Sequence, residues 1–293
     1  MRDYSRTAGS LAFDVVNILL MLVLCAVTVY PFLFVVSRSV MTEAERALRP
    51  YALLPLQGIT FEGYTYILGR GSKILTGFAV TIFRTVVGTV LSVLVEAMFA
   101  YAISKKRYPM RGVLTVILAV TLWFSAGMIP TFLVVRAVGL YNSIWVYVLV
   151  PIMGAWNVIV IRTFFSQLPE SLEESAKLDG AGDIIILFRI VFPVSTAVLA
   201  TMALFSMVYH WNEWFMGIIY ASDSGKMPVM VMLYQTLRLA VRTIRGDTWS
   251  QPAPPALSIR MALIVVTAFP IIVAYPFFQR YFVKGMLIGS VKG

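Results

Sequence analysis

The chain has few of the residues on which metal and covalent chemistry depend. Its 293 residues include one cysteine, Cys25, and one histidine, His210. A single cysteine excludes an intrachain disulfide and a cysteine metal site, and a single histidine excludes a multi-histidine zinc centre. The phosphate-binding pattern Gly-x4-Gly-Lys-Ser/Thr is also missing, because residues 69–73 do not satisfy it. We therefore expect no catalytic residue, metal or cofactor in this chain. If the chain takes part in a process driven by ATP, the nucleotide must bind to another chain.

Charged residues are also scarce. They make up 13% of the chain, against 59% hydrophobic residues. This balance lies far outside that of soluble domains and predicts an all-α, polytopic membrane protein with lipid around it. The net charge of +10 would suggest nucleic acid in a soluble protein. Here the basic residues flank apolar runs, as membrane topology requires, and we expect no nucleic-acid partner.

Apolar runs long enough to cross a bilayer define the expected topology. We interpret the first run as an uncleaved helix, because further runs follow it. A basic cluster ends the second run and marks a cytoplasmic end, so loops 37–76 and 220–260 are expected outside and both termini inside. A short surface helix is expected near 42–48. The chain is expected to form one transmembrane domain, residues 1–293, with six spans at about 11–36, 77–104, 113–135, 143–161, 190–219 and 261–282.

Two ionisable residues lie inside the second run and are functional candidates by default. Arg84 and Glu96 are twelve residues apart, about 18 Å along a helix, so they cannot pair directly. We expect both to be structural, with Arg84 reaching the outer interface and Glu96 bonding a neighbouring helix. In the third run, Gly127 and Pro130 break the helix. A packing kink and a pathway lining both explain that break.

A polar and aromatic cluster near the end of the fifth run is suited to a sugar. It comprises His210, Trp211, Asn212, Glu213 and Trp214. Tryptophan rings stack on sugar faces, and amide or carboxylate oxygens accept hydrogen bonds from hydroxyl groups. An interfacial aromatic belt explains the two tryptophans equally well, without a substrate. Pathway lining and interface anchoring therefore both remain open for this cluster.

Basic residues are in excess in the second external loop, where the topology rule predicts few. Arg238, Arg242 and Arg245 recur at helical spacing and would form a stripe on a helix over residues 237–245. A solvated face is one interpretation. Contact with an acidic partner protein or an anionic substrate is the other.

A polar stretch between the fourth and fifth runs predicts a surface helix. Pro169 suits a first helical position, Glu170, Glu173 and Glu174 are favoured in the first turns, and Gly180 ends the helix. Apolar residues recur on one face. The pattern predicts a helix that docks on a partner protein; the alternative is a solvated acidic loop.

Residues 174–180, Glu-Ser-Ala-Lys-Leu-Asp-Gly, are followed after nine residues by Ile-Val-Phe-Pro at 190–193. This spacing resembles the cytoplasmic loop signature of the membrane subunits of bacterial ABC importers, Glu-Ala-Ala, three residues, Gly, nine residues, Ile-x-Leu-Pro. Ser175 and Phe192 depart from the pattern. The resemblance implies a cytoplasmic coupling helix that contacts the ATP-hydrolysing subunit through Glu170, Glu173, Glu174, Ser175, Ala176, Asp179 and Gly180.

Further matches, at 139–143, 164–165, 168–169, 211–212 and 284–285, resemble the carbohydrate-importing branch of that family. The resemblance implies a multi-pass permease of the bacterial inner membrane that imports an oligosaccharide by alternating access. It also implies a second homologous permease subunit, two ATP-binding subunits that carry ATP and Mg²⁺, and an extracytoplasmic solute-binding protein. The external basic excess favours an anionic sugar, of alginate or pectin type.

Two other classes compete with this interpretation. An ion-coupled secondary carrier would need its own paired intramembrane charges and usually an internal repeat. A membrane enzyme would need a nucleophile motif, which the shortage of histidine and cysteine argues against. A requirement for ATP and a separate binding protein distinguishes an importer subunit from both.

Overall fold

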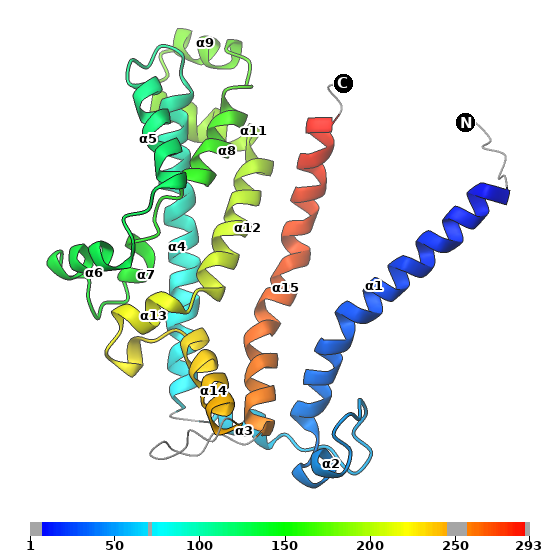
Figure 1. Cartoon of the computed structure of the whole chain (residues 1–293). Helices are drawn as coiled ribbons and strands as arrows, with labels where there is room; N and C mark the ends of the chain where they lie inside the picture. The colour runs from blue at the N-terminus through cyan, green and yellow to red at the C-terminus, as the bar shows by residue number, and fades with distance from the viewer. Residues whose placement is uncertain (1–7, 70–71, 245–256, 291–293) are drawn as a thin grey trace. The chain divides into compact units, whose positions relative to one another are not determined.

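The computed structural model describes residues 8–69, 72–244 and 257–290, and these are helical apart from turns, loops and one isolated β-bridge between Met41 and Ile59 (Figure 1). The expected all-α class is therefore confirmed. The chain separates into two compact units, Met1–Arg70 with Thr236–Thr267, and Gly71–Gln235 with Ala268–Gly293. The single transmembrane domain remains a prediction.

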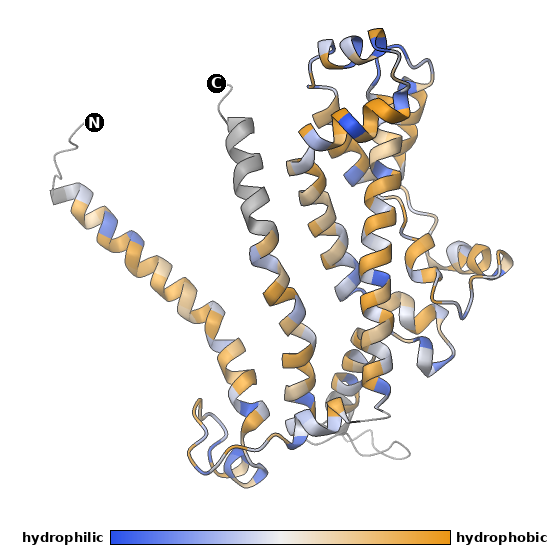
Figure 2. Ribbon diagram, turned by 180° about the vertical axis from the view of Figure 1, so that it is seen from behind, coloured by the Kyte–Doolittle hydropathy of each residue, from blue (hydrophilic) through white to orange (hydrophobic). Residues whose placement is uncertain are grey.

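The first unit begins with a long apolar helix, α1 (Ala8–Val40). Most of its side chains are exposed, and Figure 2 shows hydrophobic residues along nearly its whole length. A helix that is apolar all round needs lipid or another apolar surface around it. Helices α2 (Glu43–Leu48) and α3 (Glu62–Leu68) follow. The expected surface helix near 42–48 is thus confirmed, and Thr42 caps it by accepting the Glu45 N–H at 3.3 Å.

Buried polar contacts order the connection after α1. The Arg46 guanidinium donates to the carbonyl oxygens of Arg38 and Met41, and the Glu45 carboxylate accepts the Leu56 N–H at 2.7 Å. The described part of the expected external loop 37–76 is therefore a folded segment and not a loose linker. Part of α14 (Val229–Ile244) and part of α15 (Leu257–Ser290) complete this unit.

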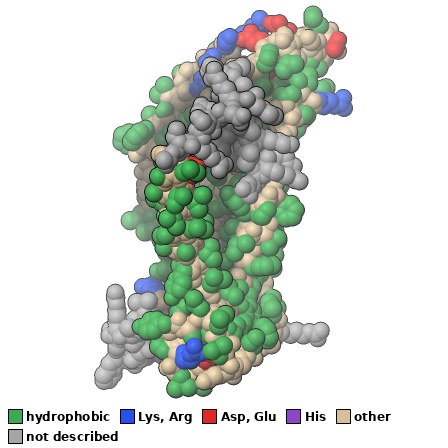
Figure 3. All heavy atoms as spheres, turned by 90° about the vertical axis from the view of Figure 1, so that its right-hand side faces the viewer, with side chains coloured by type: hydrophobic (Ala, Val, Ile, Leu, Met, Phe, Trp, Pro, Cys, Tyr) green, Lys and Arg blue, Asp and Glu red, His purple; other side chains and the backbone are tan. Residues whose placement is uncertain are grey.

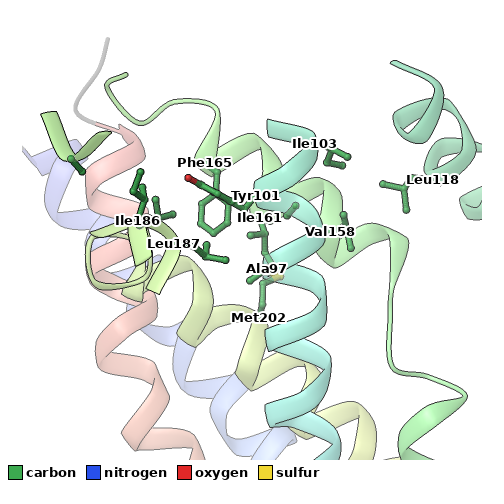
Figure 4. Packing of buried hydrophobic residues seen from close by; sticks show 13 residues of the cluster. Ala97, Tyr101, Ile103, Leu118, Val158, Ile161, Phe165, Ile186, Leu187 and Met202 are labelled. Atoms are coloured by element: carbon green, nitrogen blue, oxygen red, sulfur yellow. The ribbon is translucent and has the colours of Figure 1, made fainter. Parts of the chain in front are cut away.

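The second unit is arranged around α4 (Lys73–Ser104). Helices α5 (Arg111–Trp123), α8 (Ala155–Phe165) and α12 (Thr196–Asn212) pack on α4. Near the end of α4 an apolar cluster joins these helices, and Figure 4 shows it in close-up. Its buried members include Ala97, Tyr101, Ile103, Leu118, Val158, Ile161, Phe165, Ile186, Leu187 and Met202.

Breaks interrupt the expected third and fourth spans. Helix α5 meets α6 (Met128–Ala137) at 117°, and Gly127, at φ +81°, precedes α6, so the predicted break in the third run is confirmed. The expected fourth span, about 143–161, stays a prediction, but its residues do not form one continuous helix. They include α7 (Val146–Leu149) and the start of α8, and the backbone between these helices is not helical. Pro151 and Gly154 lie in this gap, and neither favours helix continuation.

The expected fifth span is also divided. The segment Asp183–Val194, formed by α10 (Asp183–Ile186), η1 (Leu187–Val191) and α11 (Phe192–Val194), meets α12 at 86°. A separate helix, α13 (Phe215–Tyr220), follows α12. Among the described residues, 3 helices are long and apolar enough to cross a membrane, or up to 5 if each bent pair is one span. Six spans remain a prediction.

Candidate functional site

The expected docking helix is α9 (Ser171–Leu178), eight residues long. It starts two residues after the predicted first position, with Glu170 as its N-cap. It ends in a Schellman motif, in which the N–H groups of Ala181 and Gly180 donate to the carbonyl oxygens of Ala176 at 2.9 Å and Lys177 at 3.0 Å. Gly180 has φ +80°, a conformation that a side chain disfavours, so the prediction that it ends the helix is confirmed.

The apolar side chains around α9 divide into two groups. Ala176 is buried and packs into the cluster at the end of α4, with Leu168 partly buried against it. Leu178 is 89% exposed, and Leu172 and Ile184 are also exposed. One group fixes α9 to its own unit, and the other leaves apolar surface open to a partner.

Two acids that the sequence assigned to partner contact are bound within the chain. Glu173 pairs with Lys105, and Glu170 pairs with Lys106 at 2.7 Å. The Lys105 ammonium also lies 3.8 Å from the centre of the Tyr101 ring. Sequence reasoning used both lysines only as a topology signal and missed that they hold α9.

The remaining predicted residues of α9 differ in their surroundings. Within the described ranges, Glu174 and Asp179 are exposed and have no basic group within ion-pair distance. The Ser175 hydroxyl donates to the Ser171 carbonyl at 2.9 Å, inside the helix. Glu174 and Asp179 are therefore the acids of this set that stay open for an external contact.

A cleft of about 650 Å³ separates the end of α4 and the turn after it from α9. Figure 3 shows basic and acidic side chains side by side at this end of the second unit. Burial lowers the pKa of Lys105, and hydrogen bonding to the Glu173 carboxylate opposes that shift. The charged lining of the cleft comprises Lys105, Lys106, Arg107, Arg111, Glu170, Glu173, Glu174, Lys177 and Asp183.

The buried Arg84 side chain does not reach an interface, so that expectation is wrong. Its guanidinium donates to the Glu213 carboxylate at 3.2 Å and to the Glu213 carbonyl at 2.9 Å, and it lies 4.9 Å from the centre of the Tyr147 ring. The other carboxylate oxygen of Glu213 accepts the Met216 N–H at 2.8 Å. Glu213 therefore joins α4 to the break between α12 and α13, and both of its carboxylate oxygens are in use.

The other members of the predicted sugar cluster do not all face one site. His210 is 1% exposed and Trp211 is 6% exposed, whereas Asn212 is exposed and its amide donates to the Val208 carbonyl at 2.9 Å. Trp214 stacks on Tyr234 with ring centres 4.0 Å apart. In a separate break, Gly127 has open space around it.

Glu96 bonds a neighbouring helix, as expected. It is 1% exposed, and its carboxylate accepts the Gly154 N–H at 2.9 Å and the Asn157 amide at 3.0 Å. Because Gly154 precedes α8, Glu96 satisfies an N–H at the start of that helix from a different helix. Sequence reasoning missed Asn157, since its partner is distant along the chain.

The predicted basic stripe is only partly described. Arg238 is exposed on α14, whereas the Arg242 side chain and Arg245 lie outside the described residues. The stripe remains a prediction. Over the residues that the structure describes, no group of three His, Cys, Asp or Glu could hold a metal ion.

Comparison with known proteins identifies the family. Residues 88–288 match the family described as "Binding-protein-dependent transport system inner membrane component". Protein LplC of Bacillus subtilis (strain 168) is 41% identical over 288 residues, which cover 98% of this chain and 97% of LplC. The polygalacturonan/rhamnogalacturonan transport system permease protein YtcP of the same organism is 38% identical over 284 residues, 96% of this chain and 98% of YtcP.

A solved structure agrees with these relatives. A chain from the crystal structure of a bacterial ABC transporter involved in the import of the acidic polysaccharide alginate is 31% identical, with a TM-score of 0.84, and the match covers 94% of this chain and 99% of that chain. The chain therefore belongs to the binding-protein-dependent transport system inner membrane component family, as a non-catalytic ABC transporter permease subunit.

Proposed function

We propose that the chain is the permease subunit of an ATP-driven oligosaccharide importer and forms half of its translocation path. The observation that carries this proposal is α9, a short helix that ends in a defined Schellman motif and has exposed apolar side chains beside it. Such a helix gives a separate ATP-hydrolysing subunit a rigid part of the permease to bind and move. Nearly full-length similarity to a named transport permease, YtcP, supports the same function.

We place the ATPase contact on the open group of side chains. Leu172, Leu178 and Ile184 supply the apolar centre, with Glu174 and Asp179 at its rim. Burial of one exposed leucine stabilises a complex by about 1.5–3 kcal/mol. The other predicted coupling residues act indirectly, because Glu170, Glu173, Ser175, Ala176 and Gly180 hold the position or shape of α9.

The substrate we propose is an anionic oligosaccharide. Alginate and polygalacturonan, the substrates named for two similar proteins, are polymers of sugar acids. Arg238 is exposed on α14, and Arg242 and Arg245 continue its spacing. An acidic face of the solute-binding protein is the other candidate for this stripe. In the path itself, Asn212 and Trp214 remain candidates for sugar contact, whereas His210, Trp211 and Glu213 support their positions.

The assembly we propose contains a second homologous permease subunit, two ATP-binding subunits with ATP and Mg²⁺, and an extracytoplasmic solute-binding protein. The family description, which names dependence on a binding protein and an inner membrane, supports this assembly and location. We propose six spans with both termini and α9 in the cytoplasm. The basic cluster beside α9 supports that orientation.

The complete importer, reconstituted in proteoliposomes, tests this function. We expect accumulation of an oligogalacturonide to require both ATP and the solute-binding protein, and to exceed that of a neutral oligosaccharide of equal length. Uptake driven by an ion gradient without ATP would contradict the importer and favour a secondary carrier. Equal uptake of acidic and neutral sugars would contradict only the anionic substrate.

A further inference from the structure

Helix α9 is attached to the second unit in two ways. The peptide chain joins it to α8 through residues 166–170. Ion pairs join it to the residues that follow α4, Lys105 to Glu173 and Lys106 to Glu170. The first pair is the more buried, with side chains 28% and 19% exposed, against 77% and 66% for the second. A displacement of α9 therefore acts on α4 as well as on α8.

Polar contacts also fasten α8 to α4 near both ends of α8. At its start, Glu96 holds the Gly154 N–H and the Asn157 amide. Toward its end, the Arg162 guanidinium donates to the Ile103 carbonyl of α4 at 3.3 Å. Sliding of α8 along α4 would break both contacts. Helices α4, α8 and α9 thus form a closed frame, in which a shift of one helix pulls on the other two.

Farther along α4, further contacts reach other interruptions in the chain. Arg84 holds Glu213 at the junction of α12 and α13. The Thr81 hydroxyl accepts the N–H of Val229, the first residue of α14, at 2.9 Å. Arg84 and Glu96, the two buried charged residues of α4, therefore each bind a segment where a helix is interrupted. Interrupted segments change angle more easily than a continuous helix does.

We propose that α4 carries the displacement of the docking helix to these interruptions. The ion pair of Lys105, and to a lesser degree the more exposed pair of Lys106, couples α4 to α9. About 13 Å and 32 Å farther along the helix, Glu96 and Arg84 couple α4 to the interruptions before α8 and after α12. These side chains are positioning residues for coupling. The inference rests on the proposed docking of α9 on an ATPase subunit, and it adds a route that does not depend on the peptide link to α8.

The test reverses the charges of the more buried pair in the complete reconstituted importer. The measured quantity is the number of oligosaccharide molecules imported per ATP hydrolysed, alongside subunit assembly. We expect Lys105→Glu and Glu173→Lys each to lower this ratio at least about fivefold while the assembly persists. The combined Lys105→Glu/Glu173→Lys variant should recover to within about twofold of the original ratio, because the pair is restored with opposite polarity.

Arg136→Glu is the matched control. Arg136 is exposed on α6 of the same unit, and none of the ion pairs in the described ranges includes it. Its reversal changes the net charge of the chain equally, and we expect an unchanged ratio. Single reversals that keep the original ratio, or a double variant as poor as either single one, would overturn the role of α4.

Failure of this inference can be distinguished from failure of the proposed function. Leu178→Asp tests docking alone, because Leu178 is exposed and belongs to the open group. If this variant keeps full ATPase binding, the docking proposal itself is wrong. If it loses binding while the charge reversals leave the ratio unchanged, docking stands and displacement passes only through the peptide chain.

Discussion

The Glu96 carboxylate on α4 accepts the backbone N–H of Gly154 at 2.9 Å, across a gap of 58 residues in the sequence. Through this contact a buried acid supplies the partner that the start of α8 lacks within its own helix. The same carboxylate accepts the side-chain amide of Asn157, the third residue of α8. The break before α8 is therefore a fixed feature with a defined partner.

Removal of the Glu96 carboxylate should destabilise the protein. Glu96→Ala leaves the Gly154 N–H and the Asn157 amide without their acceptor, which costs about 1–3 kcal/mol per unsatisfied group. Glu96→Gln keeps an oxygen acceptor and should lose much less. Thermal unfolding in detergent, followed by size-exclusion chromatography, measures the difference. Equal midpoints for the alanine variant and the original protein would contradict the role of Glu96.

The pair between Arg84 and Glu213 makes a second prediction. Removal of one partner of a buried ion pair costs about 3–5 kcal/mol, because the other charge is left alone. We expect Arg84→Leu to lower the unfolding midpoint strongly. Adding Glu213→Gln should recover part of the loss, because the amide removes the stranded charge and still accepts the Met216 N–H. A double variant less stable than Arg84→Leu would argue against this pairing.

The close packing of Gly88 on His210 predicts a compensating pair of substitutions. A Cβ atom at residue 88 would lie 2.6 Å from the imidazole ring, closer than side chains tolerate. Gly88→Ala should therefore reduce the free energy of unfolding by about 1–3 kcal/mol through overpacking, and so lower the unfolding midpoint. In a His210→Ser background, the same Gly88→Ala change should lower the midpoint much less, because the smaller serine makes room for the Cβ atom. Gly88→Ala without effect would show that α4 and α12 do not approach this closely.

The pair between Glu170 and Lys106 predicts a pH dependence for the attachment of α9. Hydrogen bonding to Lys106 lowers the pKa of Glu170 when the chain is folded. Because that pKa is lowered, ionised Glu170 stabilises the attachment of α9 at pH values above its ordinary pKa of about 4.3. This contribution is lost as the pH falls through the lowered pKa. A spin label at Asp179, in a Cys25→Ser background, should become more mobile over that range. Lys106→Gln should reduce the change; an identical pH profile would contradict the pairing.

Local sequence signals predicted several helix ends and one interruption. The end of α9 was predictable because Gly180 can adopt a positive φ, and the surface helix at 43–48 because Thr42 is a good N-cap. The interruption at Gly127 was predictable for a similar reason. Each of these features is decided within a few residues of the chain, where the sequence pattern is informative.

The partners of buried charges were not predictable in the same way. Arg84 and Glu213 are 129 residues apart, and Lys105 and Glu173 are 68 apart, so no local pattern links them. The interruption before α8 was missed because an apolar run of sufficient length predicts a continuous span, whereas Glu96 stabilises an irregular backbone there. Such long-range pairs depend on how the helices pack, which composition and periodicity do not encode.

The most direct measurement is the affinity of the ATP-binding subunits for the permease pair that contains Leu178→Asp. Leu48→Asp is the matched control, because Leu48 is a similarly exposed leucine on α2, in the other unit. Loss of one buried leucine contact of about 1.5–3 kcal/mol predicts a Kd raised about tenfold or more for Leu178→Asp. The control should keep the original Kd. An unchanged Kd for Leu178→Asp would contradict the claim that α9 is where the ATPase engages this chain.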